Sequence, residues 1–166
     1  MTKVGFVSLG CVKNLTDTEV MLRKLHDAGF EITPDESEAE IIVVNTCGFI
    51  ESAKQESIDN ILDVAWLKKN GKCKHIIATG CLVERYREEV MAELPEVDAL
   101  IGVGSIHRIA EAVDALYRGE KFIAFDDKET CKLGGDRILT TDEHTAYLKI
   151  AEGCDTRPYR KALERT

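Results

Sequence analysis

Residues 41–48 have the sequence Ile-Ile-Val-Val-Asn-Thr-Cys-Gly, in which four β-branched apolar residues lead without a break into a polar turn. A continuous apolar run of this length predicts a strand that is buried on both faces, as in a parallel sheet covered by helices. Residues 4–11 and 75–81 repeat the arrangement, and each of these segments ends in a Gly-Cys pair. We therefore expect three strands of one sheet, each followed closely by a cysteine.

Amphipathic helices are expected between these strands. From residue 51 to residue 69, the apolar side chains of Ile58, Ile61, Leu62 and Ala65 recur at the spacing of one helix face. Similar reasoning predicts further strands at residues 97–102 and 122–125, and helices from a capping box at 16–19 to Gly29, from 83 to 94, and from 106 to 119.

Apolar strands that alternate with amphipathic helices predict an α/β fold over residues 1–125. The expected architecture is a doubly wound, flavodoxin-like and mostly parallel sheet of about five strands, with helices on both faces. The polar residues 126–145 are interpreted as a linker. Residues 146–150 predict one more strand, which leads toward Gly153 and Cys154.

Composition narrows the class of protein. The chain of 166 residues has 30 acidic and 22 basic side chains, for a formal net charge of −8. A basic surface that neutralises several phosphates is therefore scarce, so direct nucleic-acid binding is not expected. The sequence has no apolar run of roughly 18 residues, as a membrane span needs, and no signal peptide is predicted. We expect a cytoplasmic protein that does not enter a membrane.

The placement of three of the six cysteines indicates a shared metal site. Cys11, Cys47 and Cys81 each follow a different predicted strand. The carboxyl ends of parallel strands meet at one edge of a sheet, and neighbouring strands lie about 4.8 Å apart. Each thiol would also lie near the start of a helix, where the helix dipole favours a thiolate. The alternative is that each cysteine is a small buried apolar residue.

The remaining cysteines are expected to lie apart from this site. Cys73 precedes the strand that Cys81 follows, and eight extended residues span roughly 26 Å. Cys131 falls in the linker and is interpreted as a free thiol. Three thiolates without a Cys-x-x-Cys pair suit a structural zinc ion poorly, because that ion takes four protein ligands. An iron–sulfur cluster in which one iron lacks a protein ligand suits them better.

Three motifs resemble those of the radical-SAM methylthiotransferases, and the resemblance covers residues 3–154. The motifs are Ser-Leu-Gly-Cys-Val-Lys-Asn at residues 8–14, Asn-Thr-Cys-Gly-Phe-Ile at 45–50, and Thr-Gly-Cys-Leu at 79–82. Within that family, the first two motifs are similar to those of the RimO-like branch, which modifies an aspartate of a small-subunit ribosomal protein. The tRNA-modifying MiaB-like branch typically has other residues after the first two cysteines.

The resemblance implies that Cys11, Cys47 and Cys81 hold an auxiliary [4Fe-4S] cluster that donates sulfur. A second [4Fe-4S] cluster, which cleaves S-adenosylmethionine, would belong to a following barrel domain. Cys154 matches the first ligand of that cluster, but Pro158 and Lys161 occupy the positions of the other two cysteines. Residues 146–166 are thus expected to be the truncated, disordered start of the second domain, and the chain alone is not expected to be an active transferase.

Neighbouring polar residues allow two interpretations. Lys13, Asn14, Asp17 and Asn45 could orient the cluster or contact the substrate, or they could serve only as turn and cap residues. No catalytic residue is predicted. Rival functions are a tRNA-modifying methylthiotransferase domain and a flavodoxin-like module that binds a nucleotide or flavin, although a dinucleotide fingerprint after residue 102 would need a third glycine where His107 stands.

Overall fold

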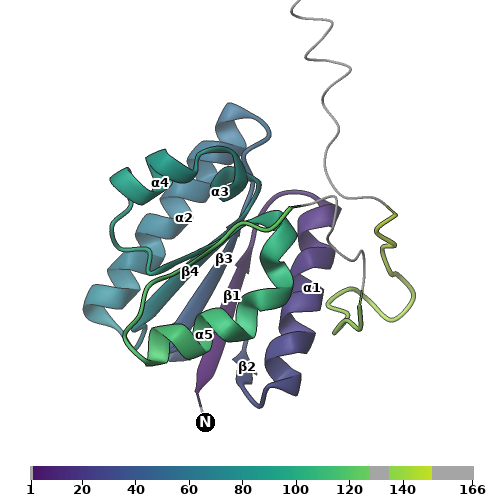
Figure 1. The fold of residues 1–166 in the computed structure, drawn as a ribbon. Helices are drawn as coiled ribbons and strands as arrows, with labels where there is room; N and C mark the ends of the chain where they lie inside the picture. Colours follow the sequence, from purple (N-terminus) through teal and green to yellow (C-terminus); the bar gives the residue numbers. More distant parts are fainter. Residues whose placement is uncertain (1, 128–134, 151–166) are drawn as a thin grey trace, which may run out of the picture.

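The computed structural model of the chain describes residues 2–127 and 135–150. Its centre is a six-stranded sheet in which every neighbouring pair of strands is parallel, in the order β2-β1-β3-β4-β5-β6. The predicted doubly wound α/β class is confirmed (Figure 1). The strands are β1 (Lys3–Ser8), β2 (Glu31–Thr33), β3 (Ile41–Thr46), β4 (His75–Gly80), β5 (Ala99–Ile101) and β6 (Phe122–Ala124).

Helices cover both faces of the sheet. On one face lie α1 (Val12–Asp27) and α5 (Ile109–Tyr117), and on the other lie α2 (Glu51–Asn70), α3 (Cys81–Arg85) and α4 (Arg87–Glu93) (Figure 1). Short 3₁₀ turns, η1 (Glu36–Glu38) and η2 (Val103–Arg108), complete the elements. None of the helices that the structure describes is long and apolar enough to span a membrane.

The strand β3 explains why an unbroken apolar sequence forms the middle of the sheet. Ile42 and Val44 belong to the hydrophobic core under α2, whereas Ile41 and Val43 belong to the core under α1 and α5. Successive side chains of a strand point to opposite faces, so a strand between two cores has to be apolar at every position.

The strand order reverses between β1 and β3, because the chain passes from β1 outward to β2 and then continues on the other side of β1. In open α/β sheets, ligands bind beyond the carboxyl ends of the strands at such a reversal. The turns after β1 and β3 are those that contain Cys11 and Cys47. The strand order therefore identifies this edge of the sheet as a candidate binding site.

Several elements differ from the sequence prediction. The edge strand β2 was not expected, because three residues that include Glu31 and Thr33 carry no apolar pattern. Helix α1 begins at Val12 rather than at the capping box of residues 16–19, and the Thr16 hydroxyl donates to the Lys13 carbonyl oxygen at 2.7 Å inside the helix. The helix predicted over 83–94 is interrupted at Tyr86.

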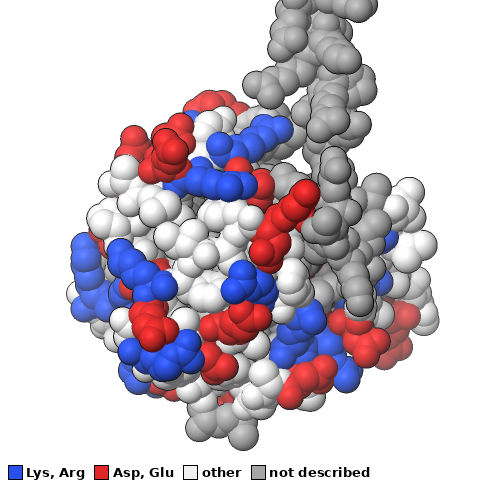
Figure 2. Space-filling view, in the orientation of Figure 1, with Lys and Arg blue, Asp and Glu red and all other residues white. Residues whose placement is uncertain are grey.

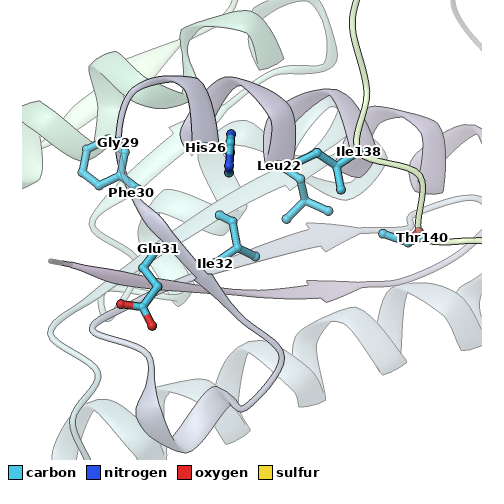
Figure 3. Close-up of a pocket in the computed structure, with 8 residues that line it drawn as sticks. All are labelled: Leu22, His26, Gly29, Phe30, Glu31, Ile32, Ile138 and Thr140. Atoms are coloured by element: carbon cyan, nitrogen blue, oxygen red, sulfur yellow. The ribbon is translucent and has the colours of Figure 1, made fainter.

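Residues 135–150, which we call the strap, lie beside α1 (Figure 1). The prediction of a strand over residues 146–150 is wrong, because these residues have no regular secondary structure and pair with none of the strands that the structure describes. Instead, the Ile138 amide donates to the Glu19 carbonyl oxygen at 3.2 Å. A groove between the strap, α1 and β2 is lined by Leu22, His26, Phe30, Ile32, Ile138 and Thr140 (Figure 3).

Candidate metal centre

Cys11, Cys47 and Cys81 lie at the same edge of three adjacent strands. Cys11 is the N-cap of α1, directly beyond the turn that follows β1. Cys47 follows β3, and Cys81 is the first residue of α3 after β4. Ser8 pairs with Asn45, and Thr46 pairs with Gly80, so the three strands end at nearly the same level. We call this place the cysteine edge.

Two glycines allow the three turns to contact one another. Gly10 has a φ of 89°, and a Cβ atom there would lie 2.7 Å from Cys47 Cβ and 3.0 Å from Cys47 Sγ. A Cβ atom on Gly48 would lie 2.9 Å from the Cα atom of Leu82. The segment after β1 thus contacts the segment after β3 through Gly10 and Cys47. The segment after β3 also contacts the start of α3, through Gly48 and Leu82. Only glycine permits both approaches without displacing backbone.

Asn14 links all three turns through its buried side chain. Its amide nitrogen donates to the carbonyl oxygens of Leu9 at 3.0 Å and Thr46 at 2.9 Å. Its amide oxygen lies 3.9 Å from Cys81 Sγ. Asn45 adds a second connection, because its amide donates to the Asn14 carbonyl oxygen at 2.8 Å. Both asparagines therefore hold backbone in place, as turn residues do, and they do so next to the thiols.

Two residues that the metal-site argument from the sequence did not use fix the second turn. The Ser57 hydroxyl, on α2, accepts a hydrogen bond from the Cys47 amide at 2.9 Å and lies 2.8 Å from the Cys47 carbonyl oxygen. The Arg85 guanidinium, at the end of α3, donates to the Gly48 carbonyl oxygen at 3.0 Å. Their sequence signal was weak, because a lone serine or arginine inside a helix is usually unremarkable.

The thiols differ in exposure, and the electrostatic surroundings of Cys81 differ from expectation. Cys11 is exposed, Cys47 is buried and Cys81 is half-buried. Burial raises the pKa of the Cys81 thiol, the charge of Lys13 lowers it, and the nearby Cys47 and Cys11 raise it again. Desolvation thus outweighs the expected stabilisation of a thiolate at the helix start. A metal that binds Cys81 has to displace its proton.

The other cysteines do not share this edge within the described residues. Cys73 precedes β4 at the opposite end of the sheet, where burial raises the pKa of its thiol to about 11. Its thiol lies 3.4 Å from the His75 carbonyl oxygen. Cys131 and Cys154, together with Pro158 and Lys161, lie outside the residues that the structure describes.

In the described ranges 2–127 and 135–150, no three His, Cys, Asp or Glu side chains form a group that could hold one metal ion. The three thiols of the cysteine edge are neighbours, but they do not surround a single ion.

Comparison with known proteins places the chain in a family. Residues 3–102 match the model of "Uncharacterized protein family UPF0004", and this match includes all three cysteines of the edge. The chain belongs to the UPF0004 family. The match ends at Gly102, so it covers the sheet through β5 and leaves β6 and the strap outside.

Curated relatives of this UPF0004 chain have a common name. This chain is 52% identical over 160 residues to the "Ribosomal protein uS12 methylthiotransferase RimO" of Caldicellulosiruptor saccharolyticus. The aligned residues cover 95% of this chain and 36% of the relative. The protein of the same name from Lachnoclostridium phytofermentans is 53% identical over 154 residues, covering 92% and 35%, and that from Geobacter sulfurreducens is 51% identical over 160 residues, covering 92% and 34%. The chain thus spans about a third of the length of these relatives.

Proposed function

We propose that this chain is the N-terminal part of a methylthiotransferase that acts on ribosomal protein uS12 and modifies an aspartate of it. The observation that carries the proposal is the match of about half of all aligned residues to several proteins with that printed name. The same similarity favours a ribosomal-protein substrate over the tRNA substrate of the rival branch. A cytoplasmic location is part of this proposal, because the proposed substrate is a ribosomal protein.

The three thiols of the cysteine edge are proposed to hold an auxiliary [4Fe-4S] cluster. Their support is chemical and geometric: thiolate sulfur is the ligand such clusters take, and each iron of a cluster can accept one thiolate, so the thiols need not surround one atom. The contacts of Gly10 and Gly48 keep the three turns together. When bound, the cluster would supply sulfur for transfer to the substrate.

The residues of this chain have separate tasks in that proposal. Cys11, Cys47 and Cys81 would provide the ligands, and each would lose a proton on binding. Asn14 and Ser57 would keep the ligand-bearing turns in place through their hydrogen bonds to backbone. These hydrogen bonds to backbone do not use the thiol sulfurs. Cys81 Sγ donates a weak hydrogen bond to Asn14 Oδ1 at 3.9 Å, and this bond would be released when iron replaces the thiol proton.

The surface agrees with a protein substrate. On the face drawn in Figure 2, acidic and basic side chains are interspersed, and no continuous basic surface is visible. Beside the cysteine edge, the large apolar side chains of Val12, Phe49 and Ile50 are exposed. Such side chains suit contact with protein better than with phosphate.

The remainder of the enzyme is also a proposal. A second [4Fe-4S] cluster and S-adenosylmethionine would be bound by the part of the relatives that this chain does not cover, with Cys154 corresponding to the first ligand of that cluster. Because this chain has Pro158 and Lys161 at the next two ligand positions, it is proposed to be inactive as a transferase by itself.

Iron content tests the cluster assignment directly. The chain is purified without oxygen and reconstituted with iron and sulfide, and iron, sulfide, zinc and flavin are measured per chain. We expect about four irons per chain, and loss of most of them in each of Cys11→Ala, Cys47→Ala and Cys81→Ala. Cys73→Ala is the matched control and keeps its iron. Equal iron in all four variants, or a colourless zinc or flavin protein, contradicts the assignment.

A further inference from the structure

The outward side of helix α2 carries an apolar patch. Leu62 is 48% exposed, and Trp66, the single tryptophan of the chain, is 62% exposed. Side chains four residues apart on a helix are neighbours, so these two form one patch rather than two scattered apolar residues. The opposite side of α2, with Ile61, Val64 and Ala65, packs in the core beneath it. Packing against the sheet therefore accounts for that side of α2 and not for the patch.

Carboxylates lie next to the patch on the same side of the helix. Asp59 and Asp63 are exposed, and so is Glu56 one turn before them. Asp59 accepts a hydrogen bond from the Gln55 amide at 2.8 Å, and this donor is neutral. Among the ion pairs that the structure describes for residues 2–127 and 135–150, none involves these three carboxylates. We call the following residues the α2 face: Glu56, Asp59, Leu62, Asp63 and Trp66.

The positive charges of α2 pair with carboxylates outside the α2 face. The pairs are Lys54 with Glu51 at 3.9 Å, Lys68 with Asp98 at 2.5 Å, and Lys69 with Glu96 at 3.8 Å. The lysines of this helix thus leave the carboxylates of the α2 face uncompensated. A negative surface with an apolar centre is the result.

We propose that the α2 face is a docking surface for a basic segment of the ribosomal-protein substrate. A ribosomal protein binds RNA and therefore carries basic side chains, which complement the carboxylates of the α2 face. Tryptophan is among the residues most enriched at the centre of protein interfaces, where it supplies much of the binding energy, and charged residues suit the rim. The identity of this partner rests on the proposed function.

The position of α2 suits a substrate that reacts at the cysteine edge. The helix begins at Glu51, shortly after Cys47, and Trp66 lies ~22 Å further along it at 1.5 Å per residue. A protein of ordinary size spans that distance, so it can bind the α2 face and still reach the thiols. The strap lies beside α1 on the other face of the sheet (Figure 1), and Leu62 and Trp66 are exposed with the strap in place.

Binding of the metal-free chain to immobilised uS12 of Caldicellulosiruptor saccharolyticus tests the inference. Biolayer interferometry at low and at physiological salt gives the association and dissociation rate constants. Trp66→Ala should weaken binding at least about tenfold, mainly through faster dissociation, because truncation of an apolar anchor acts on that rate. Glu56→Gln/Asp59→Asn/Asp63→Asn should instead slow association about tenfold at low salt and reduce its dependence on salt, because charges at a rim steer encounter.

A matched pair of residues on α5 controls for unspecific attraction between an acidic chain and a basic protein. Asp114 and Tyr117 are exposed and have the same spacing as Asp63 and Trp66. Asp63→Asn/Trp66→Ala and Asp114→Asn/Tyr117→Ala each remove one negative charge and one aromatic ring. We expect the first double variant to weaken binding at least about tenfold and the second to change it less than about twofold.

The inference is overturned if uS12 does not bind, or if the two double variants bind it equally well. It is also overturned if sedimentation velocity shows a dimer of the chain that Trp66→Ala dissociates, because the α2 face then binds a second copy. Circular dichroism establishes that each variant is folded, and if a Trp66 variant is not, the triple amide variant decides the question.

The outcomes separate this inference from the proposed function. Because binding is measured without metal, failure of the chain to take up iron refutes the cluster assignment and leaves the docking result unaffected. Normal iron uptake with equal binding by all variants overturns the docking surface alone. Binding of a transfer RNA but not of uS12 overturns both the docking surface and the proposed substrate.

Discussion

The side-chain amide of Asn14 donates to the carbonyl oxygen of Thr46 at 2.9 Å, across the boundary between the first and second cysteine turns. The same amide donates to Leu9. These two bonds give a donor to the backbone oxygens of Leu9 and Thr46 where the sheet ends. One side chain thus holds together two segments that are far apart in the sequence.

Replacing Asn14 with alanine is expected to lower the free energy of unfolding by about 2–4 kcal/mol, because two backbone oxygens at a buried position lose their donor. Urea unfolding of the metal-free chain measures the change. The control is Asn60→Ala, which removes an exposed bond to the Glu56 carbonyl oxygen on α2 and is expected to cost less than about 0.5 kcal/mol. Equal costs for the two variants would show that Asn14 does not connect the turns.

The approach of Gly10 to Cys47 predicts a difference between two glycine substitutions. Gly10 and Gly29 have nearly the same φ, 89° and 88°. An added Cβ atom would have no neighbour within 4 Å at Gly29, but at Gly10 it would lie 2.7 Å from Cys47 Cβ. Gly29→Ala should therefore show only backbone strain, about 1 kcal/mol. Gly10→Ala should cost about 1–3 kcal/mol more, from overpacking, and should also lose iron on reconstitution. Similar unfolding curves and iron contents would contradict the close contact.

Ser57 is expected to stabilise the fold, because its hydroxyl accepts a hydrogen bond from the Cys47 amide and lies 2.8 Å from the Cys47 carbonyl oxygen. Ser57→Ala should lower the free energy of unfolding by about 1–3 kcal/mol, since a buried backbone amide loses its acceptor. Ser52→Ala, an exposed serine one turn and a residue earlier on α2, is the control and should be neutral or slightly stabilising, because alanine favours helix. If both serines behave alike, the Ser57 bonds carry no stability.

The main strands could be predicted because the residues that determine them are adjacent in the sequence. The apolar residues Ile41 to Val44 serve two cores at once, and only a central strand of a covered parallel sheet has this environment. The position of each cysteine relative to its strand was visible for the same reason. By contrast, β2 pairs only at the sheet edge, beside β1, where no apolar pattern is required.

The two residues that were interpreted as a capping box lie inside α1 and have other partners there. Thr16 and Glu19 have the spacing of a capping box, but Glu19 is bound by Thr140 of the strap, far away in the sequence. A pattern search along the chain cannot detect that partner. The raised pKa of Cys81 has the same origin, since it depends on how deeply three separate turns bury one thiol.

Alkaline pH should reveal the buried thiol at the other end of the sheet. Burial raises the pKa of Cys73 from the ordinary 9.0 to about 11, so the folded chain holds this proton more tightly than the unfolded chain does. Its contribution to stability is complete below pH 9.0 and is lost as the pH rises toward about 11. Urea unfolding at a series of alkaline pH values should show a smaller decline in Cys73→Ala than in the original chain. Cys11→Ala, which removes an exposed thiol, serves as the comparison, and parallel declines for all three chains would refute the assignment.

The last prediction concerns the attachment of the strap through Glu19. Its carboxylate accepts hydrogen bonds from the Thr140 amide and hydroxyl, at 2.9 and 3.2 Å, and lies 3.5 Å from the Arg137 guanidinium. Glu19→Gln keeps the shape of the side chain but removes its charge, which leaves Arg137 without this ionic partner. We expect a loss of about 1–3 kcal/mol in unfolding free energy, because charged hydrogen bonds are stronger than neutral ones.

Hydrogen exchange at the Ile138 and Thr140 amides separates local detachment from global unfolding. Both amides donate to Glu19, one to its carbonyl oxygen and one to its side chain. In Glu19→Gln, exchange at Thr140 should rise more than exchange in the central strand β3, because the strap can open without disturbing the sheet. Glu111→Gln, on α5, removes an exposed pair with Arg108 of η2 and should leave strap exchange unchanged. A uniform rise across the strap and β3 would mean that the strap is not an independent unit and unfolds only with the sheet.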